Sequence, residues 1–198
     1  MPNTPVLHTA RLLLRRFEAA DAAAVFALLR DPAVNRFLPL YPPSTLEEAA
    51  AFLRARYLEQ YGKPHGAHYA ICLKDSAAPI GYLDVADDES HDLGYALRRE
   101  YWGRGIAAEA GRAVIAALRD APLPYITATH DVQNPASGAV MRKLGMTYRY
   151  SYREQWQPKD ISVVFRIYQR NFDGCETRVY RAYWDRCPEH FVETGPGL

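Results

Sequence analysis

The chain has 198 residues, 48% of them hydrophobic, which is enough for one compact domain with a sizeable core. Its 24 basic and 23 acidic side chains nearly cancel, and this balance argues against a partner held mainly by charge, such as nucleic acid or a membrane surface. With three scattered cysteines, no signal-peptide pattern and no apolar run long enough to cross a membrane, the chain is expected to be soluble and cytoplasmic, without disulfides or a metal site.

The first part of the chain predicts a strand followed by two helices. Residues 11–17 form a plausible first strand, and Asp21 is expected to cap a helix that Pro32 limits. After a proline-rich loop, Ser44-Thr-Leu-Glu47 has the spacing of a capping box, and it predicts a second helix that runs to about Tyr61.

The middle of the chain predicts a meander and a further helix. Residues 68–73, 80–85 and 92–97 are three short strands, and the short links between them indicate antiparallel pairing. Apolar residues at helical spacing then predict a helix that begins near Ile106, and a strand follows at residues 125–131.

The last part predicts a short helix and a hairpin. Asn134-Pro135 suits the N-cap and first position of a helix that ends at Gly145. Residues 146–156 and 161–168 are expected to pair as two strands, and the aromatic tail that starts at Asn171 is expected to pack on the domain.

Two glycines separate the strand at residues 92–97 from the helix near Ile106. Gly103 and Gly105 let the backbone turn sharply and direct successive N–H groups to one point, where the helix start adds its positive dipole end. Arg104 adds a full positive charge at the same place. The segment therefore predicts a binding site for a pyrophosphate or a similar oxyanion.

Two better-known phosphate loops fit this segment poorly. Residues 103–108 formally match the dinucleotide fingerprint Gly-x-Gly-x-x-Gly/Ala, but residues 98–102 separate them from the strand, and the preceding strands form a meander rather than a βαβ unit. The Walker pattern fails because no Gly-Lys-Ser/Thr follows.

Two motifs carry a resemblance to a known family. The first is Leu93-Gly-Tyr-Ala-Leu before Tyr101-Trp-Gly-Arg-Gly-Ile-Ala-Ala-Glu-Ala, and the second is Asn134-Pro-Ala-Ser-Gly-Ala-Val-Met-Arg-Lys-Leu-Gly-Met. With the order of elements, they resemble the GCN5-related N-acetyltransferases (GNAT), most closely the RimJ/RimL-like ribosomal-protein N-terminal acetyltransferases. Glu100 departs from the superfamily pattern Gln/Arg-x-x-Gly-x-Gly/Ala at its first position.

The resemblance implies the GNAT fold. This is an α/β (α+β) architecture with a mixed, mostly antiparallel central sheet of about six to seven strands flanked by helices. Residues 1–198 would form a single acetyltransferase domain, with its core at about residues 7–170 and a C-terminal extension at residues 171–198 packed on it. The extension could serve a homodimer interface or cover the edge of the sheet.

The resemblance also implies acetyl-CoA as cosubstrate, with its pyrophosphate on the backbone amides of the glycine loop. The pantetheine arm would run beside the end of the preceding strand like an added strand. Asn134 can be a helix cap alone or can also reach the cofactor arm, and the family places a serine near the thioester sulfur at Ser137. The residues expected to bind acetyl-CoA are Leu97, Arg98, Gly103, Arg104, Gly105, Ile106, Ala107, Asn134 and Ser137.

Amine attack on a thioester requires a neutral amine and a stabilised leaving thiolate. An α-amino group has a pKa near ~7.7 to 8 and needs only a weak base, whereas a lysine near ~10.4 needs more help. Asp92 is the first candidate for the base and Glu100 the second. Ser137 is the candidate acid and Tyr148 the alternative, while His130 could relay a proton or line the pocket.

We expect an acetyl-CoA-dependent N-acetyltransferase that works by direct attack in a ternary complex, since no cysteine lies near the cofactor motifs. The closest branch favours a protein N-terminal α-amine as acceptor. A small-molecule amine such as a polyamine, amino acid or antibiotic stays open, and the acidic run at residues 84–92 favours a polycation. The alternative from a different class is a non-catalytic acetyl-CoA-binding sensor module.

Overall fold

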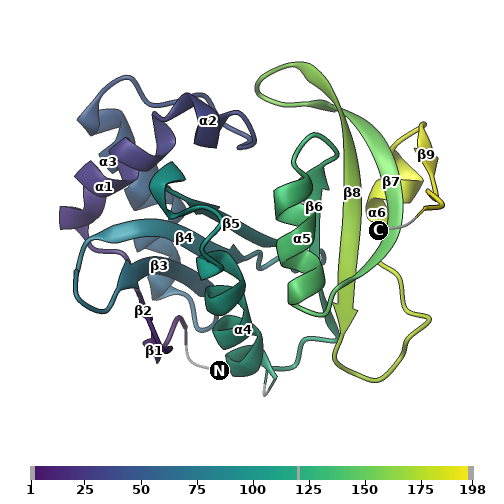
Figure 1. The fold of residues 1–198 in the computed structure, drawn as a ribbon, viewed down its shortest axis with the longest axis horizontal. Helices are drawn as coiled ribbons and strands as arrows, with labels where there is room; N and C mark the ends of the chain where they lie inside the picture. The colour runs from purple at the N-terminus through teal and green to yellow at the C-terminus, as the bar shows by residue number, and fades with distance from the viewer. Residues whose placement is uncertain (1–2, 120, 196–198) are drawn as a thin grey trace.

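The strands of the computed structural model, which describes residues 3–119 and 121–195, form two antiparallel sheets (Figure 1). The first contains, in order, β1 (Leu7–His8), β2 (Leu12–Arg15), β3 (Ala67–Leu73), β4 (Pro79–Val85) and β5 (Leu93–Leu97). The second contains, in order, β6 (Tyr125–Asp131), β8 (Ile161–Asn171), β7 (Thr147–Trp156) and β9 (His190–Phe191).

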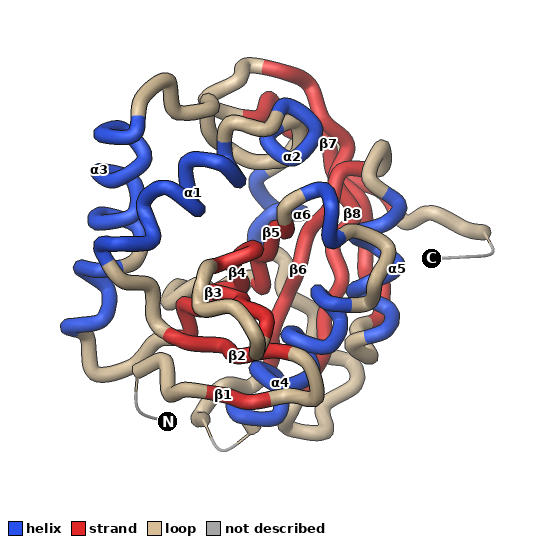
Figure 2. The backbone as a smooth tube through the Cα atoms, turned by 60° about the vertical axis from the view of Figure 1, so that its left-hand side comes forward, coloured by secondary structure: helices blue, strands red, loops and turns tan. Residues whose placement is uncertain are grey.

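A single parallel bridge between Asp92 and Thr127 joins the two sheets in the described part of the chain. Figure 2 shows β4, β5 and β6 side by side through the middle of the molecule. The prediction of a mixed, mostly antiparallel sheet is confirmed, because all pairs within the sheets are antiparallel and the connection between the sheets is parallel.

Helices cover both faces of the first sheet. One face packs against α1 (Ala22–Leu29) and α3 (Leu46–Arg56), which contact Ala70 and Cys72 of β3, and the short α2 (Pro32–Asn35) follows α1. The other face packs against α4 (Ile106–Leu118), which contacts residues of alternate register such as Tyr69 and Ile71. Three 3-10 turns complete this part: Ala19–Asp21, Leu58–Gly62 and Arg99–Tyr101.

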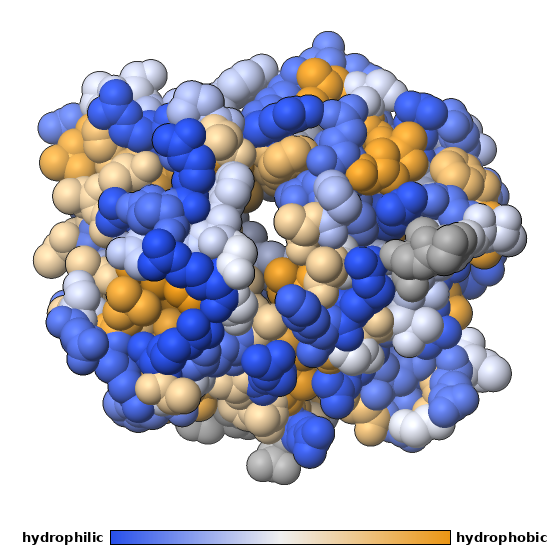
Figure 3. Space-filling view, in the orientation of Figure 1, coloured by the Kyte–Doolittle hydropathy of each residue, from blue (hydrophilic) through white to orange (hydrophobic). Residues whose placement is uncertain are grey.

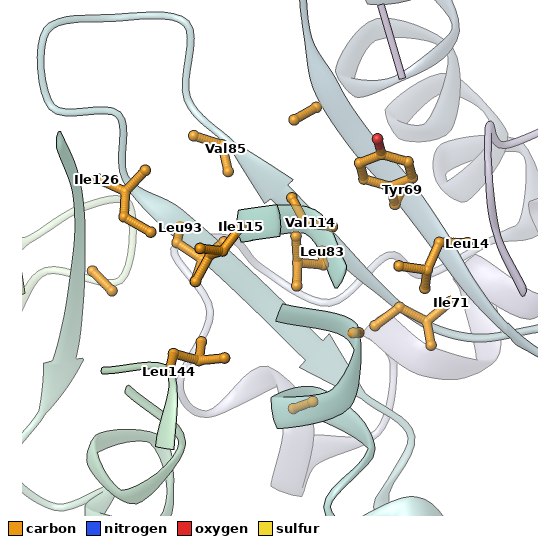
Figure 4. Packing of buried hydrophobic residues seen from close by; sticks show 14 of the residues in the cluster. Leu14, Tyr69, Ile71, Leu83, Val85, Leu93, Val114, Ile115, Ile126 and Leu144 are labelled. Carbon is orange, nitrogen blue, oxygen red and sulfur yellow. The ribbon is translucent and has the colours of Figure 1, made fainter. Parts of the chain in front are cut away.

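The main core lies between α4 and the first sheet (Figure 4). Leu83 and Leu93 from neighbouring strands meet Val114 and Ile115 of α4, and Leu144 reaches the same cluster from the end of α5 (Pro135–Lys143). Burying these side chains is the main favourable term of folding, at roughly 25 cal/mol per Å² of apolar surface. The cluster also fixes the angle between α4 and α5, whose N-terminal ends carry the two predicted motifs.

Both predicted helix caps in the first part of the chain need correction. The carboxylate of Asp21 does not cap α1, because it accepts two hydrogen bonds from Arg15 and one from the N–H of Glu18 within the preceding 3-10 turn. The second helix is capped one residue later than predicted, by Thr45, whose Oγ1 accepts the N–H of Glu48 at 3.2 Å.

Several element ends also differ from the predicted ones. The second helix ends at Arg56 and continues as a 3-10 turn, whereas β8 runs to Asn171 because its partner β6 pairs with it from Asp131 back to Tyr125. The first strand is shorter than residues 11–17, since the N–H of Phe17 leaves the ladder and bonds to the Tyr61 hydroxyl.

The tail beyond β8 packs on the second sheet. It forms α6 (Ala182–Arg186) and β9, which pairs with Ser151 and Tyr152 of β7. Tyr183 stacks on Tyr152 with ring centroids 4.7 Å apart. No helix in the described ranges is long and apolar enough to span a membrane.

Candidate active site

The glycine loop ends in an open helix N-terminus. Gly103 and Gly105 have φ of 72° and 74°, in the left-handed region that favours glycine, and Gly105 is the N-cap of α4. Among the described residues no side chain caps this end, so the first amides of α4 keep their hydrogen-bonding capacity. A Cβ placed on Gly103 would meet nothing within 4 Å. The loop therefore offers an open cradle of N–H groups for an oxyanion.

Glu109 holds this loop from inside α4. Its carboxylate accepts hydrogen bonds from the Thr9 hydroxyl at 2.6 Å and from the N–H and Nε of Arg11 at 3.0 and 2.7 Å. Arg11 also donates to the Arg104 carbonyl at 3.1 Å. Partial burial opposes ionisation of Glu109, but these bonds together lower its pKa. The residue thus ties the loop to the start of the chain.

The strand before the loop exposes one edge. Arg98 donates its N–H to the Ile80 carbonyl at 2.8 Å, and in an antiparallel pair the intervening residues turn their N–H and C=O groups the other way. Leu97 and Tyr95 therefore direct their backbone polar groups away from β4 and toward β6. Beyond the bridge between Asp92 and Thr127, β6 diverges from β5, and the opening between them is called the gap below. The Leu97 carbonyl accepts the indole N–H of Trp102 at 2.7 Å. The backbone N–H of Leu97 faces the gap.

The second motif forms the N-terminus of α5 across this gap. The Asn134 side chain caps the helix by accepting the N–H of Ser137 at 3.3 Å, and Pro135 occupies the first turn as predicted. The Ser137 hydroxyl lies 2.7 Å from the hydroxyl of Tyr95. The structure thus brings Ser137 next to the open edge of β5.

Asp92 lies at the closed end of the gap, in the bridge between the sheets. Thr127 donates to its carboxylate at 3.4 Å. Burial, reinforced by the neighbouring carboxylates of Asp84 and Asp88, raises the pKa of Asp92 to about 7. Asp84 is paired with Arg56 of α3 and therefore lies on the face covered by α1 and α3. Because the Asp92 carboxylate interacts with that of Asp84, it lies on the same face. Tyr95, an odd number of residues along β5, points to the opposite face.

The matching family model for this chain is the acetyltransferase (GNAT) domain, and it aligns with residues 11–147. This chain belongs to the GNAT family of acetyltransferases. Two N-acetyltransferases of Bacillus subtilis, YnaD and YoaA, are 29% and 28% identical to it over 142 and 146 residues. These matches cover 70% and 71% of the chain and 80% and 82% of the relatives.

Solved structures share the fold of this acetyltransferase. They include RimL, a ribosomal L7/L12 α-N-protein acetyltransferase in complex with coenzyme A, at a TM-score of 0.74 and 19% identity. A GNAT acetyltransferase from Bacillus anthracis has a TM-score of 0.73 and 22% identity. Each match covers 85% of this chain and 99% of the other. The predicted GNAT fold is confirmed, and the neighbours include the RimL type that the motifs resemble.

The other predicted catalytic residues have partners of their own in the structure. Glu100 is half exposed and forms an ion pair with Arg98, whose N–H and C=O are both used by neighbouring backbone. Tyr148 bonds to the Ser151 hydroxyl at 3.0 Å and accepts the N–H of Glu193 at 2.9 Å. Tyr148 is therefore held by the C-terminal tail.

His130 is buried beneath α5. Only 4% of the residue is exposed, its Nδ1 bonds to the Asp131 carbonyl at 2.8 Å, and its ring packs against Gly138, where a Cβ would come within 2.6 Å of Nε2. Burial lowers the pKa of His130, so the ring is neutral at physiological pH. Glycine at position 138 is what lets α5 approach this ring.

Contacts join the two halves of the molecule on the side of α1 and α2. The β7–β8 hairpin meets the segment after α1: Tyr41 donates to the Pro158 carbonyl at 2.7 Å, and Lys159 donates to the Asn35 carbonyl. Arg36 donates to Gln133 in the same region and lines a pocket with β8 residues such as Val164. Figure 3 shows the hollow between the halves near the centre of the face.

Sequence reasoning missed Tyr95 as a member of the site and Glu193 as a residue that ties the C-terminal tail to the second sheet. Tyr95 stands within the Leu-Gly-Tyr motif, and period-two alternation along β5 places it on the same face as Leu93 and Leu97. Glu193 stands in an irregular tail, 42 residues from its partner Ser151, and no local pattern marks it. Within the described ranges, no group of three or more candidate ligands is arranged for a metal ion.

Proposed function

We propose that this acetyltransferase transfers the acetyl group of acetyl-CoA to a protein N-terminal α-amine by direct attack in a ternary complex. The observation that carries the proposal is the gap where β5 and β6 diverge, with an uncapped helix N-terminus at one side and a carboxylate of near-neutral pKa in the bridge that closes it. A cytoplasmic location, where acetyl-CoA and new protein chains occur together, is part of the proposal.

The chain has the groups that a thioester of coenzyme A needs. The amides of residues 103–107 and the Arg104 side chain would hold the pyrophosphate, and the free edge of β5 at Leu97 would pair with the pantetheine arm. Arg98 can contribute only its side chain, since its backbone groups are already bonded. Asn134 and Ser137 would approach the arm from α5. RimL with coenzyme A and the immunity acetyltransferase MccE with acetyl-CoA and AMP share this fold, at TM-scores of 0.74 and 0.70.

Asp92 is the proposed base. A carboxyl group with a pKa of about 7 is about half ionised at neutral pH, and its ionised form can take a proton from an α-ammonium group near ~8 with little loss of free energy. Proton transfer to the same base from a lysine, with a pKa near ~10.4, would cost about 3 kcal/mol more. Near-neutral basicity thus supports an α-amine as acceptor.

Ser137 is the proposed donor to the leaving sulfur. Asp92 and Tyr95 point to opposite faces of β5, and Ser137 is bound to Tyr95. The amine would therefore arrive from the side of α1 and α3 while the sulfur leaves toward α5. Tyr148, the alternative donor, is already bonded to Ser151 and Glu193.

A small-molecule amine is the second candidate acceptor, and the acidic residues around β5 favour a polycation. Their charge is partly neutralised, however, because Asp84 pairs with Arg56 and Asp87 lies 3.4 Å from Lys63. This pairing weakens the attraction that a polyamine would feel and supports the α-amine instead.

The test is thiol release from acetyl-CoA with a panel of short peptides that differ only in the first residue, each paired with its N-terminally blocked form, and with small amines and diamines. We expect turnover with free peptides only. Turnover with small amines alone would identify the second candidate. Tight binding of acetyl-CoA without turnover by any acceptor would instead identify a sensor module.

A further inference from the structure

Tyr95 and Ser137 form a pair of hydroxyls across the gap between β5 and α5. The Tyr95 oxygen lies 2.7 Å from the Ser137 Oγ and 2.9 Å from the Ser137 carbonyl oxygen. Tyr95 reaches Ser137 from the strand edge along which the pantetheine arm is proposed to run. The two residues are 42 positions apart in the chain, so only the tertiary structure creates this contact.

Counting protons determines which hydroxyl donates. A carbonyl oxygen can only accept, so the single O–H of Tyr95 is used on the Ser137 carbonyl. The hydrogen bond between the hydroxyls must then use the proton of Ser137, with the Tyr95 oxygen as acceptor. The Ser137 proton therefore points at Tyr95 and not at the gap.

The rest of Ser137 is also held. Its N–H faces both the side chain and the carbonyl of Asn134, at 3.3 and 3.1 Å, within the cap of α5. Tyr95 is thus the one described partner whose hydrogen bonds set the direction of the Ser137 O–H. Burial raises the pKa of Tyr95, so the phenol keeps its proton and acts through hydrogen bonds alone.

We propose that Tyr95 is a positioning residue that orients the Ser137 hydroxyl and strengthens it as a donor to the leaving sulfur. As the sulfur becomes negative, Ser137 turns its proton toward it, and Tyr95 turns its O–H from the Ser137 carbonyl to the Ser137 oxygen. Both O–H bonds stay intact, and the donors act in series, each bond polarising the next. The inference rests on the proposed role of Ser137.

The test is a double-mutant cycle of Tyr95→Phe and Ser137→Ala, followed by thiol release from acetyl-CoA with the best acceptor of the panel or, failing one, with water. We expect Tyr95→Phe alone to lower kcat about five- to tenfold, the worth of one hydrogen bond, with KM for acetyl-CoA changed less than about twofold. In the Ser137→Ala background, the same change should lower kcat less than about twofold, because its target is gone.

The matched control is Tyr125→Phe, which removes another tyrosine hydroxyl that donates to a backbone carbonyl, that of Glu89 at 2.7 Å. It should leave kcat unchanged. Equal losses for Tyr95→Phe in both backgrounds, or no loss in either, would overturn the inference about Tyr95 while leaving Ser137 in its role. If Ser137→Ala does not slow thiol release, the proposed role of Ser137 fails, and the inference fails with it.

Discussion

Asp92 has an ionisation that depends on three neighbours that the chain brings together from different segments. Burial contributes most to its raised pKa, and the carboxylates of Asp84 and Asp88 add to it, while the Thr127 hydroxyl works in the opposite direction. A carboxyl group that is costly to ionise is a better base than an exposed one, because the proton it accepts relieves that cost. The same cost has consequences for both rate and stability.

Asp92→Asn is expected to remove the base without changing the shape of the site. In the wild-type enzyme, kcat/KM should rise with pH through about 7 as Asp92 ionises. In the variant, this rising limb of the pH profile should disappear, and the rate at neutral pH should fall about 10²-fold. Thiol release measured as a function of pH tests both. Glu100→Gln is the control. If that variant loses the limb while Asp92→Asn keeps it, Glu100 is the base.

The raised pKa of Asp92 also predicts a pH-dependent change in stability. A carboxyl group whose pKa is higher in the folded than in the unfolded state stabilises the fold fully only below its unfolded value near ~3.9, and this contribution is lost as pH rises through about 7. Asp92→Asn should therefore raise the melting temperature relative to wild type, more at pH 8 than at pH 5. An equal difference at both pH values would contradict the raised pKa.

At the scale of elements, α4 and α5 begin at the two sides of one gap, and their N-cap residues differ. Gly105 begins α4 with a positive φ and no side-chain cap, whereas Asn134 caps α5 with its own side chain. The difference matters because an uncapped N-terminus keeps its amides for a ligand, while a capped one is stable without it. The glycine loop before α4 is therefore suited to bind a ligand, and the capped start of α5 is suited to hold Ser137 in place.

Gly105→Val is expected to abolish acetyl-CoA binding. A β-branched residue cannot adopt φ near +74° without strain, so the backbone must turn and the amides lose their common direction. Calorimetric titration should show at least about a hundredfold loss of affinity, and the fold should lose only about 1 to 2 kcal/mol. Gly174→Val is the matched control, since that glycine has the same φ of 74° in the tail. Equal binding by Gly105→Val would contradict the loop assignment.

At the scale of the whole molecule, the C-terminal tail is held to both strands of the β7–β8 hairpin. Glu193 accepts hydrogen bonds from Ser151 and Arg166, and its N–H donates to Tyr148. The aromatic residues of α6 cover the other face of the same sheet, where Tyr150 and Tyr152 would otherwise be exposed. The tail therefore contributes to the stability of the second sheet.

Glu193→Gln is expected to lower stability by about 1 kcal/mol at neutral pH, because the half-buried Arg166 would lose its charged partner. The hydrogen bond from Arg166 lowers the pKa of Glu193 despite the opposing effect of burial, so its contribution is present above ~4.3 and is lost as pH falls through the lowered value. Chemical denaturation at pH 7 and pH 3 measures this. Glu189→Gln, which breaks the exposed pair with Arg153, should change little.

Local patterns were sufficient for much of the fold. Strand alternation, the spacing of Gly103 and Gly105, and the Asn134-Pro135 cap each act within a few residues, and the structure contains the elements that they predict. Register and element ends were less predictable: whether Ser44 or Thr45 caps α3, and where β8 ends, depends on which groups find partners elsewhere in the molecule.

The amino-acid sequence by itself determined the order of the main helices and strands, the glycine loop and the family to which the chain belongs, but not the short elements β1, α2, α6 and β9. Only the tertiary structure decided that Tyr95 faces Ser137, that Glu109 holds Arg11 across 98 positions, and that Asp92 is half-buried beside other carboxylates. The physical reason is the distance along the chain over which each kind of interaction acts. Backbone conformation and capping depend on neighbours along the chain, whereas burial, charge pairing and hydrogen bonds across a gap depend on which distant segments the core brings together.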